Sequence, residues 1–148
     1  SNIELWRPSS SFASFSKRLH NVYSPNPRER TLLWFLLNEE RVSLYNCGQN
    51  IRSFTYMDDA VEGLIYAIGC NRQLINICNV QPVTTMYFAT LVKYYKSLEI
   101  ELINEKRDFD NLEQSVNRDI YLVPLSYTSV EDGVKKIFDE RKGKDISY

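Results

Sequence analysis

Short apolar runs and longer apolar stripes alternate along this chain. Compact apolar or alternating runs predict strands at residues 3–8, 42–45, 74–78 and 99–104. Polar segments rich in Ser, Asn, Gly or Pro separate these runs and predict loops and turns. Because helical stripes occur between the strands, the pattern predicts a mixed α/β or α+β fold, with short strands and about four helices in a single domain covering residues 1–148.

The four predicted helices differ in how their apolar residues are distributed. Residues 31–40 are apolar on almost every side, so this helix is either buried or covers another domain or a second copy of the chain. Asp58 is expected to cap a second helix whose inward stripe has helical spacing. Its members are Val61, Leu64, Ile65 and Ile68. Thr84 or Thr85 is expected to cap a third helix that runs to about residue 98, and residues 128–131 form a capping box before the last.

Composition and charge exclude several classes of protein. The chain has 148 residues, with 18 Lys and Arg against 19 Asp and Glu, a balance that argues against a dedicated nucleic-acid binder. No apolar run is long enough to cross a membrane. The three cysteines, Cys47, Cys70 and Cys78, are widely spaced and have no partner histidines, so we expect reduced thiols in a cytoplasmic protein and no metal site.

Common catalytic and cofactor motifs are absent from the 148 residues. There is no G-x-G-x-x-G loop and no G-x-x-x-x-G-K-[ST] loop to hold a phosphate. The single histidine, His20, has no recognisable triad context, so a structural role is expected for it. None of the ten tyrosines is followed by a lysine four residues later.

The most informative segment runs from Val42 to Glu62 and reads V-S-L-Y-N-C-G-Q-N-I-R-S-F-T-Y-M-D-D-A-V-E. It places Arg52 in an extended piece, where a guanidinium can offer its planar fork to a phosphate or carboxylate. The segment resembles, without a gap, the L-T-V-Y-G-D-G-x-Q-x-R-D-F-T-Y-V-D-D-V-V-E run of extended short-chain dehydrogenases/reductases that act on nucleotide sugars.

Further resemblances to the same family occur in the same order along the chain. Residues 21–25, N-V-Y-S-P, resemble N-V-Y-G-P, and residues 76–84, N-I-C-N-V-Q-P-V-T, resemble N-I-G-S-G-E-P-V-S. The strand before the first of these is either the one directly preceding Asn21 or residues 3–8. The resemblance covers only the carboxy-terminal, substrate-binding half of the family pattern. The cofactor-binding Rossmann half and the Tyr-x-x-x-Lys pair belong to the other half.

The resemblance implies a set of substrate-binding residues. Asn21 and Arg52 match residues that contact the diphosphate, and Leu44 and Tyr45 match the strand beside the nucleobase. Arg107 matches a second diphosphate arginine less closely. The alternative interpretations are a turn-forming role for Asn21, a structural ion pair of Arg52 with Asp58 or Asp59, and core packing for Leu44, which we favour for that residue.

The resemblance therefore implies the substrate-binding portion of an NAD(P)-dependent nucleotide-sugar epimerase or dehydratase, with a UDP- or dTDP-sugar as ligand. No cofactor is expected on this chain, and catalysis by this chain alone is not expected. The pattern has lost glycines, since Asn46 and Cys47 replace Gly and Asp, and Ser24, Cys78 and Val80 also stand where the family has glycine. The alternative is a non-catalytic interaction module derived from the family, with the segment from Thr31 to Leu37 covering a partner domain or a second copy.

Overall fold

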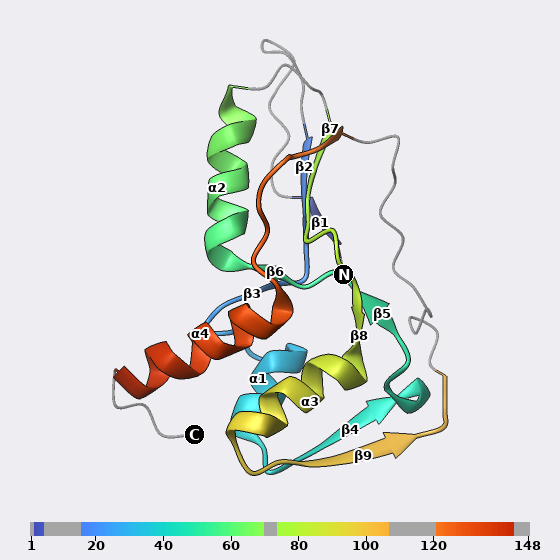
Figure 1. Cartoon of the computed structure of the whole chain (residues 1–148). Helices are drawn as coiled ribbons and strands as arrows, with labels where there is room; N and C mark the ends of the chain where they lie inside the picture. The colour runs from blue at the N-terminus through green and yellow to red at the C-terminus, as the bar shows by residue number, and fades with distance from the viewer. Residues whose placement is uncertain (1, 5–15, 70–73, 107–120, 144–148) are drawn as a thin grey trace.

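The computed structural model describes residues 2–4, 16–69, 74–106 and 121–143. In chain order the elements are β1 (Asn2–Glu4), β2 (Ser16–His20), β3 (Val22–Tyr23), α1 (Leu32–Asn38), β4 (Arg41–Tyr45), the short 3-10 helix η1 (Asn46–Gly48), β5 (Ile51–Arg52), β6 (Thr55–Tyr56), α2 (Met57–Ile68), β7 (Leu74–Ile77), β8 (Val83–Thr84), α3 (Thr85–Tyr95), β9 (Glu99–Ile103), β10 (Tyr121–Leu122) and α4 (Val130–Gly143). This arrangement confirms the mixed α/β class with short strands and four helices among the described residues (Figure 1).

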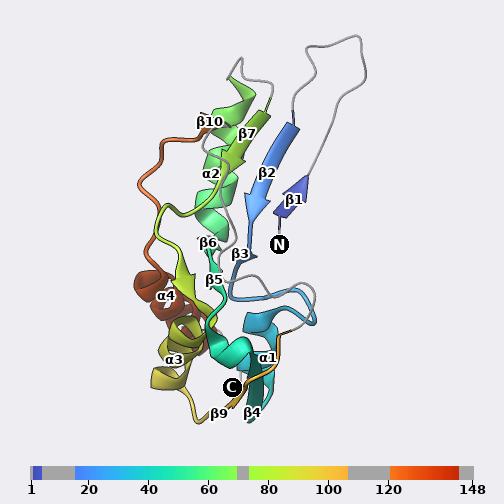
Figure 2. The same cartoon turned by 90° about the vertical axis from the view of Figure 1, so that its right-hand side faces the viewer.

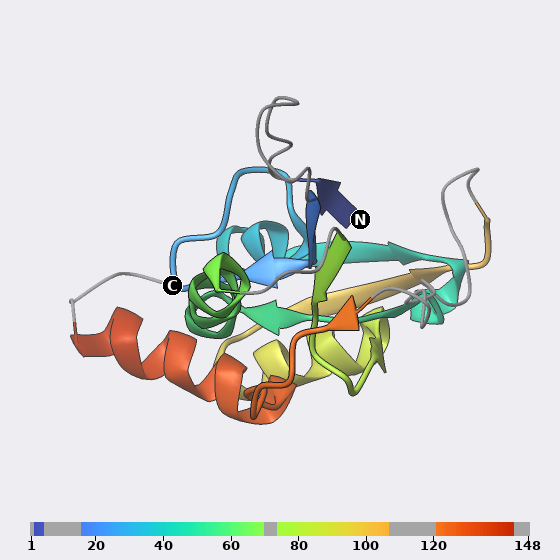
Figure 3. The same cartoon turned by 90° about the horizontal axis from the view of Figure 1, so that it is seen from above.

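A four-stranded sheet forms one end of the molecule, with strand order β1-β2-β7-β10. Strands β2, β7 and β10 are parallel, whereas β1 pairs antiparallel with β2 at the edge. Helix α2 runs along this sheet, as the views from the front and from above show (Figures 1 and 3). Ala60 and Ala67 of α2 pack with Ile75 and Ile77 of β7 and with Val123 in a small core.

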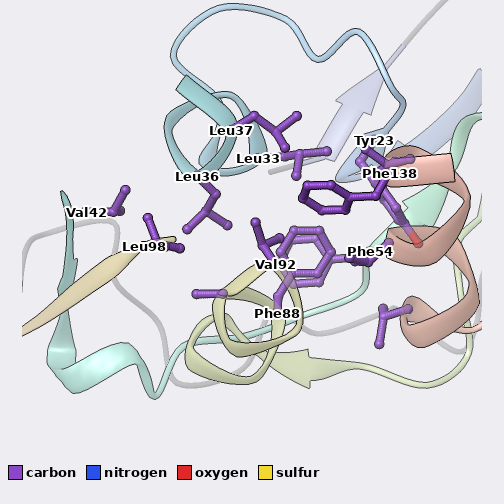
Figure 4. Packing of buried hydrophobic residues seen from close by; sticks show 14 of the residues in the cluster. Tyr23, Leu33, Leu36, Leu37, Val42, Phe54, Phe88, Val92, Leu98 and Phe138 are labelled. Atoms are coloured by element: carbon purple, nitrogen blue, oxygen red, sulfur yellow. The ribbon is translucent and has the colours of Figure 1, made fainter. Parts of the chain in front are cut away.

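The other end of the molecule contains α1, α3 and α4 and the parallel pair β4–β9. Its larger core joins leucines of α1 to aromatic residues of the other segments (Figure 4). The Phe54 ring stacks on Phe88 with centroids 4.2 Å apart, and the Tyr23 ring meets Phe88 edge-on at 5.4 Å. Two short pairs, β3–β6 and β5–β8, lie between the sheet and this helical end (Figure 2).

The apolar helix α1 packs into the core of its own chain. Leu33, Leu36 and Leu37 are at most 3% exposed and belong to the large core. This burial corrects the expectation that the segment from Thr31 to Leu37 keeps its apolar face for a partner domain or a second copy. Of the two alternatives that the pattern left open, the buried helix is the one observed.

Lys96 ties the end of α1 to the end of α3. Its ammonium donates hydrogen bonds to three carbonyl oxygens at the carboxyl end of α1, those of Leu36 at 2.8 Å, Leu37 at 3.2 Å and Glu39 at 2.9 Å. A cation at this position complements the negative end of the helix dipole. Partial burial lowers the pKa of Lys96 from its ordinary value.

Helix α2 differs from its prediction in both its start and its buried face. It begins at Met57, so Asp58 lies in the first turn and is not the cap. Val61, Ile65 and Ile68, predicted to face inward, are 48%, 65% and 80% exposed. The buried positions are Asp59 and the small residues Ala60, Gly63 and Ala67. The small residues let the helix approach β7 closely, because a Cβ at Gly63 would lie 2.6 Å from the Cγ2 atom of Ile77.

Candidate functional site

Asn21 lies in a sharp turn between β2 and β3. Its φ of 40° is in the left-handed region, which Asn adopts more readily than most residues. Its carbonyl accepts a hydrogen bond from the backbone N–H of Thr55 at 3.2 Å, and β3 then pairs in parallel with β6. The strand directly before Asn21 is β2, which resolves the alternative that the sequence left open. The turn therefore places Asn21 beside the chain segment that follows Arg52.

Arg52 lies in β5 and is half-buried. Its backbone pairs with Val83 of β8, and two residue pairs away the Asn50 carbonyl accepts a hydrogen bond from the Thr85 N–H at 2.9 Å. The Arg52 Nη1 atom donates to the carbonyl of Ile51 at 2.9 Å, so the guanidinium folds back toward its own strand. The extended conformation predicted for Arg52 is confirmed.

Leu44 and Tyr45 end strand β4 and pair with Leu102 and Ile103 of β9. The Leu44 side chain is 5% exposed and belongs to the large core, whereas Tyr45 is half-buried. A contribution of Leu44 to a binding site would therefore come from its backbone. Arg107 lies outside the described residues.

The turn after β4 contains three successive residues with positive φ. Asn46, Cys47 and Gly48 have φ values of 51°, 53° and 67°. Such angles suit Gly, are tolerated by Asn and strain Cys. Asn46 is held on both sides, since its N–H donates to the Glu105 carbonyl and its Nδ2 to the Asn50 Oδ1 atom, each at 2.9 Å. The turn thus keeps a glycine-like shape although two of its residues are not glycine.

Tyr23, in the segment N-V-Y-S-P, has its hydroxyl buried against α4. The Oη atom has no hydrogen-bond partner among the described residues. A Cβ at Gly133 would lie 2.8 Å from the Tyr23 Cζ atom and closer still to the Oη atom, so this position of α4 requires Gly. Burial, followed by the charge of Asp59, raises the pKa of Tyr23 well above its usual range.

A buried polar cluster centred on Asn79 was not among the features predicted from the sequence. Asn79 is 3% exposed and follows β7, while Ser53 and Thr55 are at most 1% exposed. Thr55 Oγ1 accepts from the Asn79 N–H at 2.9 Å, and Ser53 Oγ donates to the Asn79 carbonyl at 2.6 Å. The detectable signal was a polar residue directly after a buried strand, a position at which an unpaired amide would be costly.

Asp59 also belongs to this part of the molecule. Its Oδ2 atom accepts a hydrogen bond from the Thr128 N–H at 2.6 Å, which connects α2 to the segment before α4. Asp59 is therefore structural, as its position at a helix start indicated. Among the described residues, no group of three or more His, Cys, Asp or Glu side chains could hold a metal ion. No helix of the described chain has both the length and the apolar character needed to span a membrane.

The hydrogen bond between Asn21 and Thr55 therefore places Asn21 beside the segment that follows Arg52. The end of β4 is connected to β5 by the short helix η1. A guanidinium and a side-chain amide are both groups that can donate hydrogen bonds to an anion.

Comparison with solved structures shows which proteins share this fold. UDP-glucose 4-epimerase from Thermus thermophilus, solved with NAD, superimposes with a TM-score of 0.68 at 18% identity, covering 86% of this chain and 46% of that one. The dTDP-glucose 4,6-dehydratase from Bacillus anthracis, solved with NAD, gives 0.67 at 16% identity, with 87% and 44% covered. The UDP-glucuronic acid 4-epimerase from Bacillus cereus, solved with UDP-glucuronic acid and NAD, gives 0.65 at 17% identity, with 86% and 45% covered. The fold is thus that of part of an NAD-dependent epimerase or dehydratase.

Comparison with known sequences finds one relative, over part of the chain. No family model matches the chain. An uncharacterized protein of Methanocaldococcus jannaschii is 39% identical over 62 residues, which are 40% of this chain and 19% of that protein. The chain spans less than half the length of the solved structures it matches and about a fifth of this relative.

Proposed function

We propose that this chain binds the nucleotide and diphosphate of a UDP- or dTDP-sugar, as the substrate-binding portion of an NAD(P)-dependent nucleotide-sugar epimerase or dehydratase. The observation that carries the proposal is the fold likeness over 86–87% of the chain to a UDP-glucose 4-epimerase and a dTDP-glucose 4,6-dehydratase. The proposal is supported by Arg52, which lies in the extended segment where the resemblance expects a diphosphate arginine.

Each candidate residue has a role that its chemistry allows. The Arg52 guanidinium would pair with the diphosphate oxygens, because its fork can donate two parallel hydrogen bonds to one anion. Asn21 would donate from its side-chain amide to the same group. Tyr45, and Leu44 through its backbone, would border the base, and Arg107 would add a second positive charge.

The cofactor would come from residues outside this chain. The 148 residues contain neither a G-x-G-x-x-G loop nor a Tyr followed four residues later by Lys. This chain would therefore supply binding energy and orientation, while hydride and proton transfer would need the cofactor-binding part that the resembled enzymes possess. The reduced cysteines Cys47 and Cys78 agree with a cytoplasmic site of action.

A second candidate function is a non-catalytic interaction module derived from the same family. It is favoured by the exposed apolar stripe of Val61, Ile65 and Ile68 on α2, which has no partner among the described residues. The replacement of family residues by Asn46 and Cys47 at positive φ also favours it, because a strained turn next to the site can lose its ligand contacts.

Calorimetric titration with UDP-glucose, dTDP-glucose, UDP and UMP tests the first function. We expect a UDP- or dTDP-sugar to bind, with UMP weaker because it lacks the second phosphate. Arg52→Ala should weaken binding about 10-fold to 100-fold, the effect of losing a charge-assisted hydrogen bond of about 1.5–3 kcal/mol. Arg41→Ala is the matched control, because Arg41 is 60% exposed in β4 and pairs with Glu101.

Two results would overturn this function. One is the absence of binding to every nucleotide and nucleotide sugar tested, in which case the interaction module becomes the better explanation. The other is an equal affinity of the Arg52→Ala and Arg41→Ala proteins for a nucleotide sugar, because the ligand would then lie elsewhere.

A further inference from the structure

Asn79 contacts all three residues that follow Arg52 in the chain. Its backbone N–H donates to Thr55 Oγ1 at 2.9 Å, and its side-chain Nδ2 donates to the Phe54 carbonyl at 3.1 Å. Its carbonyl accepts from Ser53 Oγ at 2.6 Å. A single buried residue thus fixes the backbone and side chains immediately after the candidate arginine.

The same asparagine is held from the opposite direction. Its Nδ2 atom also donates to the Thr128 carbonyl at 3.2 Å, and its Oδ1 atom accepts from the Gln81 N–H at 3.0 Å. Thr128 in turn donates to Asp59. Asn79 is therefore fixed to the loop after β7 and to the segment before α4, and it cannot follow the Arg52 segment if that segment moves.

On the other side of Arg52, the chain is held by backbone pairing and by the side chain of Asn50, whose Oδ1 atom accepts from the Asn46 Nδ2 atom at 2.9 Å. Asn50 accepts a hydrogen bond from Thr85 N–H at 2.9 Å, and Arg52 itself pairs with Val83. The two-residue strand β5 is too short to hold its own position, because a pair of this length has few ladder hydrogen bonds. The contacts directly after Arg52 therefore add to those before it in holding the position of its backbone.

We propose that Asn79 is a positioning residue for Arg52: it fixes residues 53–55 against the rest of the fold and so sets where the guanidinium meets an anionic ligand. This role rests on the proposed function for its effect on binding, although the effect on the Arg52 segment is present without ligand. Asn suits the position because one amide supplies two donors and one acceptor, and it uses all three on backbone atoms.

Removing the amide has a local consequence. In Asn79→Ala the carbonyls of Phe54 and Thr128 both lose a donor in a buried place, and the Arg52 segment gains freedom to shift. A misplacement of about 1 Å at a positioning group can cost on the order of 100-fold in function. We therefore expect a binding loss that exceeds what the loss of stability alone explains.

The first arm of the test needs no ligand. Amide hydrogen exchange is measured for the wild-type chain, for Asn79→Ala and for Lys96→Met, which removes hydrogen bonds at the end of α1. We expect exchange of the Thr55 and Tyr56 amides to rise at least about tenfold in Asn79→Ala, while the amides of α3 change much less. In Lys96→Met the change should fall on the end of α1. Equal changes at Thr55 and in α3 for Asn79→Ala would overturn the positioning role.

The second arm uses nucleotide-sugar affinity in a double-mutant cycle. If Asn79 acts through Arg52, then Asn79→Ala should weaken UDP- or dTDP-sugar binding about tenfold in the wild-type background and less than about twofold in the Arg52→Ala background. Independent, multiplicative losses would overturn the role. If the wild-type protein binds no nucleotide sugar, the proposed function fails, while the exchange arm still decides whether Asn79 fixes the Arg52 segment.

Discussion

The contact between Gly133 and Tyr23 gives the sharpest test of the packing described above. Gly133→Ala adds one carbon to the first turn of α4, where it would meet the buried Tyr23 ring. Inserting a methyl group into a filled core costs about 1–3 kcal/mol, and Ala gains about 1 kcal/mol over Gly in a helix. Because the tyrosine hydroxyl lies closer to the new carbon than any real contact allows, the upper end applies, and a net loss of about 2 kcal/mol is expected.

Thermal unfolding followed by circular dichroism measures this loss. For a chain of this length about 1 kcal/mol corresponds to about 2–4 °C, so the melting temperature should fall by about 4–8 °C. Gly143→Ala is the matched control, since within the described part of the chain a Cβ at that position would meet no atom within 4 Å beyond its neighbours in the helix. Its melting temperature should stay the same or rise slightly through the higher helix propensity of Ala.

A second substitution shows whether the clash has the stated cause. Tyr23→Phe removes a hydroxyl that has no hydrogen-bond partner among the described residues, so alone it should not lower stability. Combined with Gly133→Ala, it should restore part of the lost stability, because the nearest atom is gone and Cζ remains 2.8 Å away. The proposed clash with Tyr23 would be contradicted by a melting temperature of Gly133→Ala within about 1 °C of wild type. It would also be contradicted if the double variant were no more stable than Gly133→Ala alone.

Two further predictions concern other described contacts. Lys96→Met should lower the free energy of unfolding, measured by urea titration, by about 1–2 kcal/mol, because three carbonyls at the end of α1 lose a charged donor. Lys93 is exposed, so the control Lys93→Met should change this free energy by less than about 0.5 kcal/mol. Equal effects of the two substitutions would contradict the capping role of Lys96. Burial raises the pKa of the Cys78 thiol to about 11, from an ordinary value of 9.0, so the folded chain keeps a proton that the unfolded chain loses. The free energy of unfolding should therefore fall between about pH 9 and pH 11, and this fall should be smaller in Cys78→Ala when the two proteins are compared under reducing conditions.

The sequence predicts the elements of this fold better than it predicts which faces are buried. The strand and turn around Arg52, the cap at Thr84 and the last helix all follow from local patterns, which depend on neighbouring residues. The last helix differs from its prediction in one respect, the capping residue: the Ser129 side chain, and not that of Thr128, accepts a hydrogen bond from the backbone of the first turn, the Asp132 N–H. Capping depends on a single turn of backbone, so neighbouring Ser and Thr residues compete for it.

Helix α2 shows where such reasoning fails. A hydrophobic stripe predicts the buried face only when side-chain size does not limit the approach of the partner element. At Gly63 the distance to β7 is set by the absence of a side chain, so the small residues face the sheet, while Val61, Ile65 and Ile68 face outward and Leu64 is only partly buried. The distance between α2 and β7 cannot be predicted from the positions of the apolar residues alone.

For the candidate site, the sequence predicted the local features but not the contacts between residues far apart in the chain. The turn at Asn21 and the extended segment at Arg52 are local, and motif spacing located both. Their juxtaposition through Thr55, and the dependence of that segment on Asn79, join residues far apart in the chain. Such contacts depend on the whole fold, and a single sequence does not show them.

The parallel pairing of distant strands also affects how fast the chain folds. Ser43 of β4 hydrogen-bonds to Glu101 of β9, 58 residues later, and β2 pairs with β7 over a comparable separation. The entropy of closing such loops is lost before the strand pairs contribute stability, so these pairs form late, whereas helices such as α3 and α4 form from neighbouring residues. During refolding the strands therefore stay unpaired longest, and this interval is when the chain is most prone to associate with other copies.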